Sequence, residues 1–263
     1  MAIDSLGSLA NLFVSRLDLG WTLLLLMTRY MAFMVIVPGL GSGIAGIAIR
    51  YPACLALALV SLQVERTAAV PTDMGLMAAQ VFSEILLGSA VGFVPLFIVS
   101  GAQTAGHLAS GTMGLNGAQL FDPSTSAPLS DVARIYSDLT ITVFLLVGGH
   151  HVAISALAGL DSGIAPGTFM MSAAGLEAFM EQTGRIFQIG CLIAAPVVVA
   201  LLLTNFVMGL ISKAIPTVNI FIISFPLTIG IGFAISVLAL PEVANFLARE
   251  MTRLPEVIGR VLA

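Results

Sequence analysis

The sequence is poor in charged residues. Only 9% of its 263 residues are Asp, Glu, Lys or Arg, whereas 58% are hydrophobic. An ordinary soluble domain has about 25% charged residues. A soluble fold of this length needs a charged surface, which ten basic and fourteen acidic residues cannot cover. With a mean hydropathy of +1.06, the chain is predicted to be an integral membrane protein.

Basic runs and cysteines are also scarce. The net charge is −4, and the sequence contains no cluster of Lys or Arg, so nucleic acid is not expected as a partner. The two cysteines, Cys54 and Cys191, each lie in an apolar run, which favours buried thiols over a disulfide or a metal site. The N-terminus carries Asp4 and lacks a basic start, so it does not resemble a cleaved signal peptide.

Long alternations of apolar and polar residues are missing, which excludes a membrane β-barrel. Continuous apolar runs are present instead, and about 20 such residues cross a bilayer as a helix. Five runs are long enough, and a sixth is short and needs the preceding GIAGIAI residues. These runs are 19–38, 76–100, 137–160, 187–211 and 218–240, with the short one at 52–62. The predicted fold class is all-α, a polytopic membrane protein with about six hydrophobic helices.

The C-terminal third shows two further patterns. The connection at 212–219 is so short that the last two hydrophobic runs are expected to form a helical hairpin. Apolar residues in the tail then recur in steps of three and four, which predicts one helical face. They are Val243, Leu247, Met251, Leu254, Ile258 and Val261. Such a helix either lies in the membrane interface or packs on a partner subunit, and the sequence leaves both open.

Two short motifs suggest chemistry but lack its context. GSGIAG at 41–46, with Glu65 further on, matches a dinucleotide-binding pattern, yet Pro38 and Pro52 flank it where a strand and an unbroken helix are required. GGHH at 148–151 offers two adjacent histidines, which point about 100° apart on a helix and suit a metal poorly. Because no nucleophile has a supporting partner by spacing, we expect no catalytic, cofactor or metal site.

Charges inside the hydrophobic runs are rarer and more informative. Arg29 and Glu84 fall in the first and third runs, where an isolated charge costs several kcal/mol. They are expected to pair with each other or at an interface, although a small-molecule transporter would also place charges there. Four residues after Glu84, GSAVG at 88–92 gives the G-x-x-x-G spacing that permits close helix packing.

Several stretches together resemble one protein family. They are RYMAFMVIVPGLG at 29–41, EILLGSAVGF at 84–93, QTAG with MGL and FDP within 103–123, LLVGGH at 145–150, and GLISKAIPTVNIFIISFPLTIGIG at 209–232. These resemble the FliR family of flagellar type III export-gate subunits, which has a similar injectisome counterpart. The last stretch is the most specific, and the family's hairpin signature falls on Lys213, Pro216, Asn219, Phe221 and Pro226.

The resemblance implies a division of the chain and a set of partners. Residues 1–185 would be similar to the gate subunit FliP, and residues 186–263 would be a FliQ-like hairpin with an amphipathic C-terminal helix. FliP-like and FliQ-like subunits, other export-apparatus membrane proteins, lipid and unfolded proteins in transit are the implied partners. The implied role is a non-enzymatic subunit in the bacterial inner membrane, at the flagellar basal body. An injectisome homologue is the alternative, ahead of a transporter.

The segment 111–131 combines a loop composition with large apolar side chains. In the family, the matching segment is a plug that projects into the pore. The resemblance therefore implies that the apolar residues close the channel while the glycines let the backbone bend. These are Met113, Leu115, Leu120 and Phe121, with Gly111, Gly114 and Gly117. The alternative is a loop whose apolar residues pack on helix ends.

Overall fold

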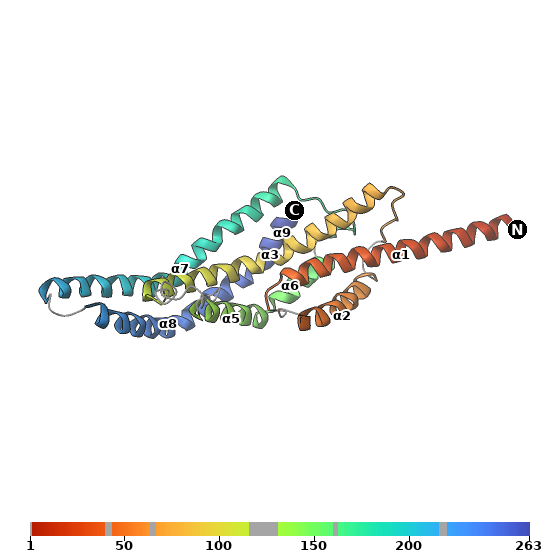
Figure 1. Ribbon diagram of the computed structural model, residues 1–263. Coiled ribbons are helices and arrows are strands. Elements are labelled where there is room, and N and C mark those ends of the chain that lie inside the picture. The colour runs from red at the N-terminus through yellow and green to blue at the C-terminus, as the bar shows by residue number, and fades with distance from the viewer. Residues whose placement is uncertain (1, 40–43, 64–66, 116–130, 160–162, 216–219) are drawn as a thin grey trace. The chain divides into compact units, whose positions relative to one another are not determined.

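The computed structural model describes residues 2–39, 44–63, 67–115, 131–159, 163–215 and 220–263, and all regular structure within these ranges is helical (Figure 1). The predicted all-α membrane fold is confirmed. The helices are α1 (Ala2–Ile36), α2 (Ile44–Ser61), α3 (Met74–Met113), α5 (Asp131–Leu146), α6 (Gly149–Leu157), α7 (Ala173–Ala214), α8 (Ile220–Thr252) and α9 (Leu254–Leu262).

Four helical stretches in the described part are long and apolar enough to cross a membrane. They are Arg16–Ile36, Met74–Met113, Ala173–Ala214 and Ile223–Leu262. The predicted run at 137–160 is not one straight helix, because the chain bends between α5, which ends at Leu146, and α6, which begins at Gly149. Gly148 lies at this bend with φ 79°, a left-handed conformation that glycine adopts without steric cost. If the bent pair is one span, the number rises to five.

The short run at 52–62 is the predicted helix that does not reach the length of a membrane span. Residues 52–62 do fall largely within α2, but the apolar helix counted there is only Ala48–Ser61. Its length is below the roughly 20 residues that a perpendicular crossing needs. A shared hydrogen bond between the Tyr30 and Ser61 hydroxyls joins this helix to α1.

The chain forms two compact units, each assembled from separated stretches. The first contains Met1–Leu96, Gly148–Glu181 and Arg253–Ala263, and the second contains Phe97–Val147 and Gln182–Thr252. These units are defined by packing, whereas the division at residue 185 came from the family resemblance and stays a prediction.

Glycines of α3 set its packing in both units. In the first unit, a Cβ built at Gly88 would lie 2.2 Å from the carbonyl oxygen of Arg29, so α1 and α3 are in backbone contact there. In the second unit, a Cβ at Gly106 would lie 2.3 Å from the Ala133 Cα of α5. No side chain fits at either position without displacing backbone, which explains the close helix approach expected from 88–92.

The tail forms two helices rather than one, since α8 ends at Thr252 and α9 begins at Leu254. The six apolar residues predicted to share a face are all buried nevertheless. Val243, Leu247 and Met251 belong to the second unit, and Leu254, Ile258 and Val261 belong to the first. Pro255 near the start of α9 suits the first turn of a helix, where its missing N–H costs nothing.

Candidate functional site: a buried charge cluster

Arg29 and Glu84 meet in the interior of the first unit. The Arg29 Nε donates to Glu84 Oε2 at 2.5 Å, and Nη2 donates to Oε1 at 3.2 Å, so the guanidinium and the carboxylate pair through two parallel bonds. The two side chains are 1% and 0% exposed. Glu84 lies one turn before Gly88, and the close approach at that glycine brings α3 within reach of Arg29.

Two backbone groups complete this buried charge cluster, defined here as Arg29, Glu84, the Leu157 carbonyl and the Gly167 amide. The Arg29 Nη1 donates to the Leu157 oxygen at 2.7 Å, where α6 ends. The Gly167 N–H donates to Glu84 Oε1 at 2.5 Å. The cluster therefore ties α1 and α3 to the end of α6 and to the segment that precedes α7.

The segment around Gly167 lies directly on α3. Gly167 has φ 77°, and a Cβ there would be 3.0 Å from the Gln80 side chain. Gln80 in turn accepts a 2.7 Å hydrogen bond from the indole nitrogen of Trp21, the single tryptophan of the chain. Sequence reasoning selected Arg29 and Glu84, but it missed Leu157 and Gly167 because they contribute only backbone groups.

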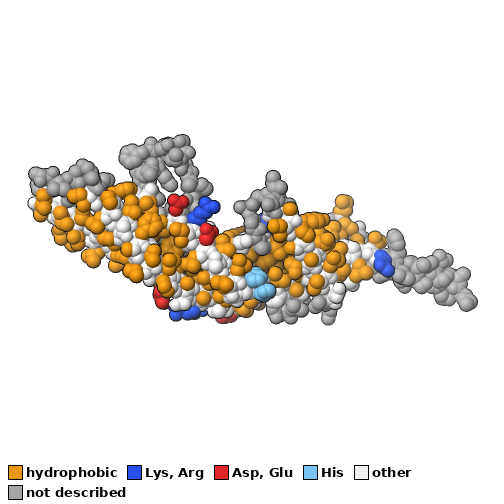
Figure 2. Space-filling view, turned by 90° about the horizontal axis from the view of Figure 1, so that it is seen from below, with side chains coloured by type: hydrophobic (Ala, Val, Ile, Leu, Met, Phe, Trp, Pro, Cys, Tyr) orange, Lys and Arg blue, Asp and Glu red, His pale blue; other side chains and the backbone are white. Residues whose placement is uncertain are grey.

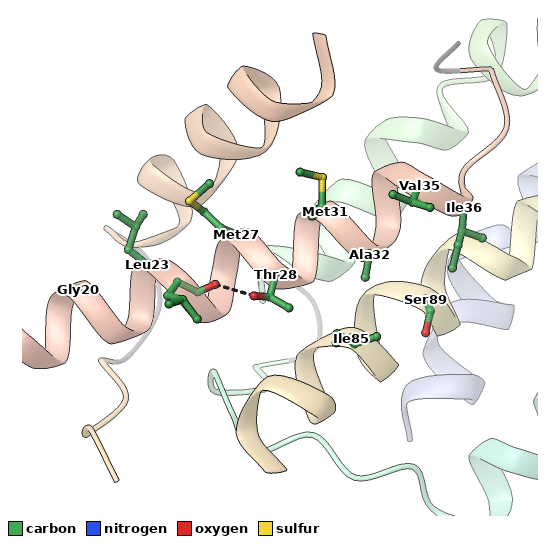
Figure 3. A pocket seen from close by; sticks show the side chains of 11 residues that line it. Gly20, Leu23, Met27, Thr28, Met31, Ala32, Val35, Ile36, Ile85 and Ser89 are labelled. Atoms are coloured by element: carbon green, nitrogen blue, oxygen red, sulfur yellow. Dashed lines mark hydrogen bonds between the residues drawn. The ribbon is translucent and has the colours of Figure 1, made fainter. Parts of the chain in front are cut away.

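An apolar groove runs along α1 and the adjacent part of α3, with a volume of about 710 Å³ (Figure 3). Its polar lining offers little to a ligand, since the Thr28 hydroxyl donates to the Leu24 carbonyl and the Ser89 hydroxyl donates to the Leu86 carbonyl. The lining includes Leu23, Met27, Met31, Val35, Ile36 and Ile85. This surface suits an apolar neighbour, in keeping with the predominantly hydrophobic face in Figure 2.

The residues predicted for the pore plug are only partly within the described part. Met113, the last residue of α3, is fully buried, Gly114 has φ 85°, and Leu115 is half-buried. Gly111 lies in the last turn of α3 and is exposed. Gly117, Leu120 and Phe121 lie outside the described residues. The plug role stays a prediction.

The residues predicted for the hairpin signature also lie only partly within the described part of the chain. Lys213 is exposed in the last turn of α7, and Pro226 lies within α8. Pro216 and Asn219 fall outside the described residues, and Phe221 belongs to α8, although its side chain is not described. In the described ranges, no three His, Cys, Asp or Glu side chains gather as metal ligands. The rings of His150 and His151 lie 4.0 Å apart at the start of α6.

Comparison with known proteins identifies the family. Residues 21–254 match the family described as bacterial export proteins, family 1. The chain belongs to this family. The match covers most of its length, including both residues of the buried ion pair and the stretch at 209–232. The resemblance inferred from the sequence motifs is thereby confirmed.

Individual members of the export family extend this result. The chain is 31% identical to the flagellar biosynthetic protein FliR of Escherichia coli K12 over 163 residues, which are 62% of each chain. It is 29% identical to FliR of Caulobacter vibrioides over 223 residues, 84% of this chain and 88% of that one. It is 26% identical to Yop proteins translocation protein T of Yersinia pestis over 234 residues, 88% and 90% of the two chains.

The match with the Escherichia coli protein thus spans less than two thirds of that relative's length. The two longer matches are to a flagellar protein, from Caulobacter, and to a translocation protein, from Yersinia. The relatives of this chain therefore carry names from two kinds of export system.

Proposed function

We propose that this chain is a non-enzymatic subunit of the flagellar type III protein export gate, where it helps to form and close the channel for unfolded flagellar proteins. The observation that carries the proposal is the family match over residues 21–254. The FliR relatives support the flagellar assignment, with 31% and 29% identity. The apolar helices support a membrane location. The proposed membrane is the bacterial inner membrane, at the flagellar basal body.

The proposed partners are FliP-like and FliQ-like subunits and other membrane proteins of the export apparatus. Support comes from the surface of the chain, where many large apolar side chains are exposed on spanning helices. Examples are Leu203, Phe206 and Leu210 on α7 and Val237 and Leu238 on α8. Lipid and neighbouring subunits are the two environments that such side chains accept.

The segment 111–131 is proposed as the part of the chain that closes the channel, on the strength of the family resemblance. Gly111, Gly114 and Gly117 would allow the chain to turn, and Leu115, Leu120 and Phe121 would exclude water and ions. Met113 would begin the plug from the end of α3. In this proposal, the buried charge cluster is structural, because it holds the first unit together around its paired charges.

The test combines secretion with purification. A strain that lacks this chain should stop secreting flagellin, and the restored full-length chain should co-purify with its neighbouring gate subunits in detergent. A strain that carries the Glu84→Ala variant in place of the parent chain serves as the control, because it shows how secretion and co-purification respond to a destabilised chain. Normal flagellin secretion without the chain, or a chain that purifies only by itself, would refute the proposal.

A role in an injectisome is the second candidate, and the Yersinia translocation protein is the observation in its favour. The secretion assay separates the two systems, because loss of an injectisome subunit should leave flagellin secretion and motility unchanged. A transporter of small solutes is a weaker alternative. Solute uptake by vesicles that contain this chain alone would revive it, although the Arg29 and Glu84 charges are already engaged with each other.

A further inference from the structure

The C-terminal end of α3 has a regular capping structure of its own. Gly114 adopts φ 85°, its N–H donates to the Gly111 carbonyl at 3.1 Å, and the Leu115 N–H donates to the Ser110 carbonyl at 3.1 Å. This pair of bonds is the Schellman motif, which ends a helix at a left-handed glycine. It satisfies two of the four carbonyls that lack a partner at a helix end and leaves the Met113 carbonyl without a partner from the motif.

A side chain of the hairpin supplies that missing bond. The Thr228 hydroxyl of α8 lies 3.1 Å from the Met113 carbonyl oxygen and 3.1 Å from the Phe225 carbonyl of its own helix. Thr228 is 5% exposed and Met113 is 0% exposed, so water does not reach this contact freely. A buried carbonyl that loses a hydrogen-bond donor is costly, so removal of the Thr228 hydroxyl is expected to weaken this contact.

The side chain of Met113 fits against the same face of α8. A Cβ built at Gly232 would lie 2.6 Å from Met113 Cγ and 2.7 Å from its Cε, so only glycine leaves room for the methionine in its present position. Residues 225, 228 and 232 share one face of α8 because they are three and four positions apart. Next to them, a Cβ at Gly114 would be 3.4 Å from the Phe225 ring.

We propose that Thr228 and Gly232 are positioning residues that anchor the end of α3 to the hairpin helix α8, so that the two helices move as one body. The point from which the chain continues beyond Leu115 is then set by α8. This inference rests on the proposed function where export is the readout, because the segment 111–131 proposed to close the channel begins at this anchor. The geometry of the anchor can be measured without export.

The first experiment measures how often the anchor opens. In the full-length chain in detergent, Met113→Cys places a thiol at the buried position, and its labelling rate is followed by mass spectrometry of the labelled peptides. Native Cys54 is buried, as predicted, whereas native Cys191 is exposed, so the prediction of a buried thiol is wrong for Cys191. The two cysteines serve as slow and fast internal references. Adding Thr228→Val should accelerate labelling at position 113 by about tenfold, while Thr228→Ser should stay within about twofold.

The labelling rates of Cys54 and Cys191 show whether a faster rate at position 113 is local or reflects loosening of the whole chain. If Thr228→Val also accelerates labelling of Cys54, the whole chain has loosened, and a local anchor is contradicted. Equal labelling at position 113 with Thr and with Val would likewise overturn the anchor. Faster labelling that is confined to position 113 is the expected result.

The second experiment tests whether the two helices separate during export. Met113→Cys is combined with Gly232→Cys in a background in which Cys54 and Cys191 are replaced by serine, because a Cβ at position 232 would lie 2.6 Å from the Met113 Cγ, the position that a cysteine sulfur would occupy. The oxidised chain should support export at the level of the reduced chain. Loss of export on oxidation that a reductant restores would show that the anchor must open.

A failure of the proposed function is distinguishable from a failure of the anchor. If cells that lack the chain secrete as well as cells that contain it, the proposed function is wrong, and the labelling rates alone decide the anchor. If the parent chain restores secretion but the oxidised one does not, the function stands and the one-body inference falls.

Discussion

At the scale of single residues, the buried charge cluster is the most demanding arrangement in the chain. Arg29 and Glu84 are nearly inaccessible to solvent, and the side chain of each forms hydrogen bonds with more than one partner. Removing one member of a buried ion pair leaves an uncompensated charge, which typically costs about 3–5 kcal/mol. The pair therefore specifies how α1, α3 and the segment at Gly167 fit together.

We expect Glu84→Ala to lower the stability of the detergent-purified chain by about 3–5 kcal/mol, because the guanidinium of Arg29 stays buried without a carboxylate. Tryptophan fluorescence measures the loss, since Trp21 contacts Gln80 in the same unit. Glu242→Ala is the matched control, because its partner Arg249 and Glu242 itself are 67% and 78% exposed. It should change the stability little. Equal losses in both variants would contradict this account.

Exchanging the charges gives a second prediction. In the double variant Arg29→Glu with Glu84→Arg, the ion pair can re-form, so stability should exceed that of either single reversal. Recovery should be incomplete, because the new carboxylate would face the Leu157 carbonyl and the new guanidinium would face the Gly167 N–H. Melting temperatures of the four chains form the cycle. Full recovery would mean that the two backbone groups contribute nothing.

At the scale of helices, α3 is organised by glycines at contacts where backbones touch. Gly106 leaves no room for a methyl group because Ala133 Cα is in its place. Gly209 of α7 and Gly230 of α8 have nothing within 4 Å of a built Cβ. Three glycines within helices thus differ sharply in their surroundings, and a substitution series can separate packing from helix propensity.

We expect Gly106→Ala to destabilise the chain by about 1–3 kcal/mol, as overpacking commonly does. Gly209→Ala and Gly230→Ala should be neutral or stabilising, because alanine is the better helix former and meets open space there. Thermal unfolding followed by circular dichroism compares the three variants. A loss at Gly209 as large as that at Gly106 would show that lipid or partner packing, rather than the contact with Ala133, sets the cost.

At the scale of helices, the sequence predicts long apolar helices and buried positions, but it does not predict contacts made by the backbone. Hydropathy located the long apolar helices, and step sizes of three and four selected six residues from Val243 to Val261 that are all buried. The bend at Gly148 escaped detection because an apolar run gives no sign that glycine adopts a left-handed conformation. Leu157 and Gly167 escaped for a related reason, since they take part in the cluster through a backbone carbonyl and a backbone amide. Contacts of that kind follow from the fold and leave no pattern in composition.

At the scale of the whole molecule, the anchor at Met113 changes how the plug proposal should be tested. Deleting residues 113–121 would remove the proposed plug together with the Met113 carbonyl, the left-handed Gly114 and the side chain that fills the space at Gly232. A loss of assembly in that deletion would have two explanations. A deletion that starts after Leu115 leaves every described contact of the anchor in place.

We therefore expect the two deletions to behave differently. Removing residues 116–121 should leave co-purification with the gate subunits intact and increase leakage of small solutes into cells, because the proposed apolar closure is lost while the end of α3 remains capped. Removing residues 113–121 should reduce co-purification as well, since the anchor to α8 is lost. Solute leakage and complex yield are measured on the same cultures. If removal of 116–121 alone abolishes assembly, these residues pack within the complex, and the plug proposal is wrong.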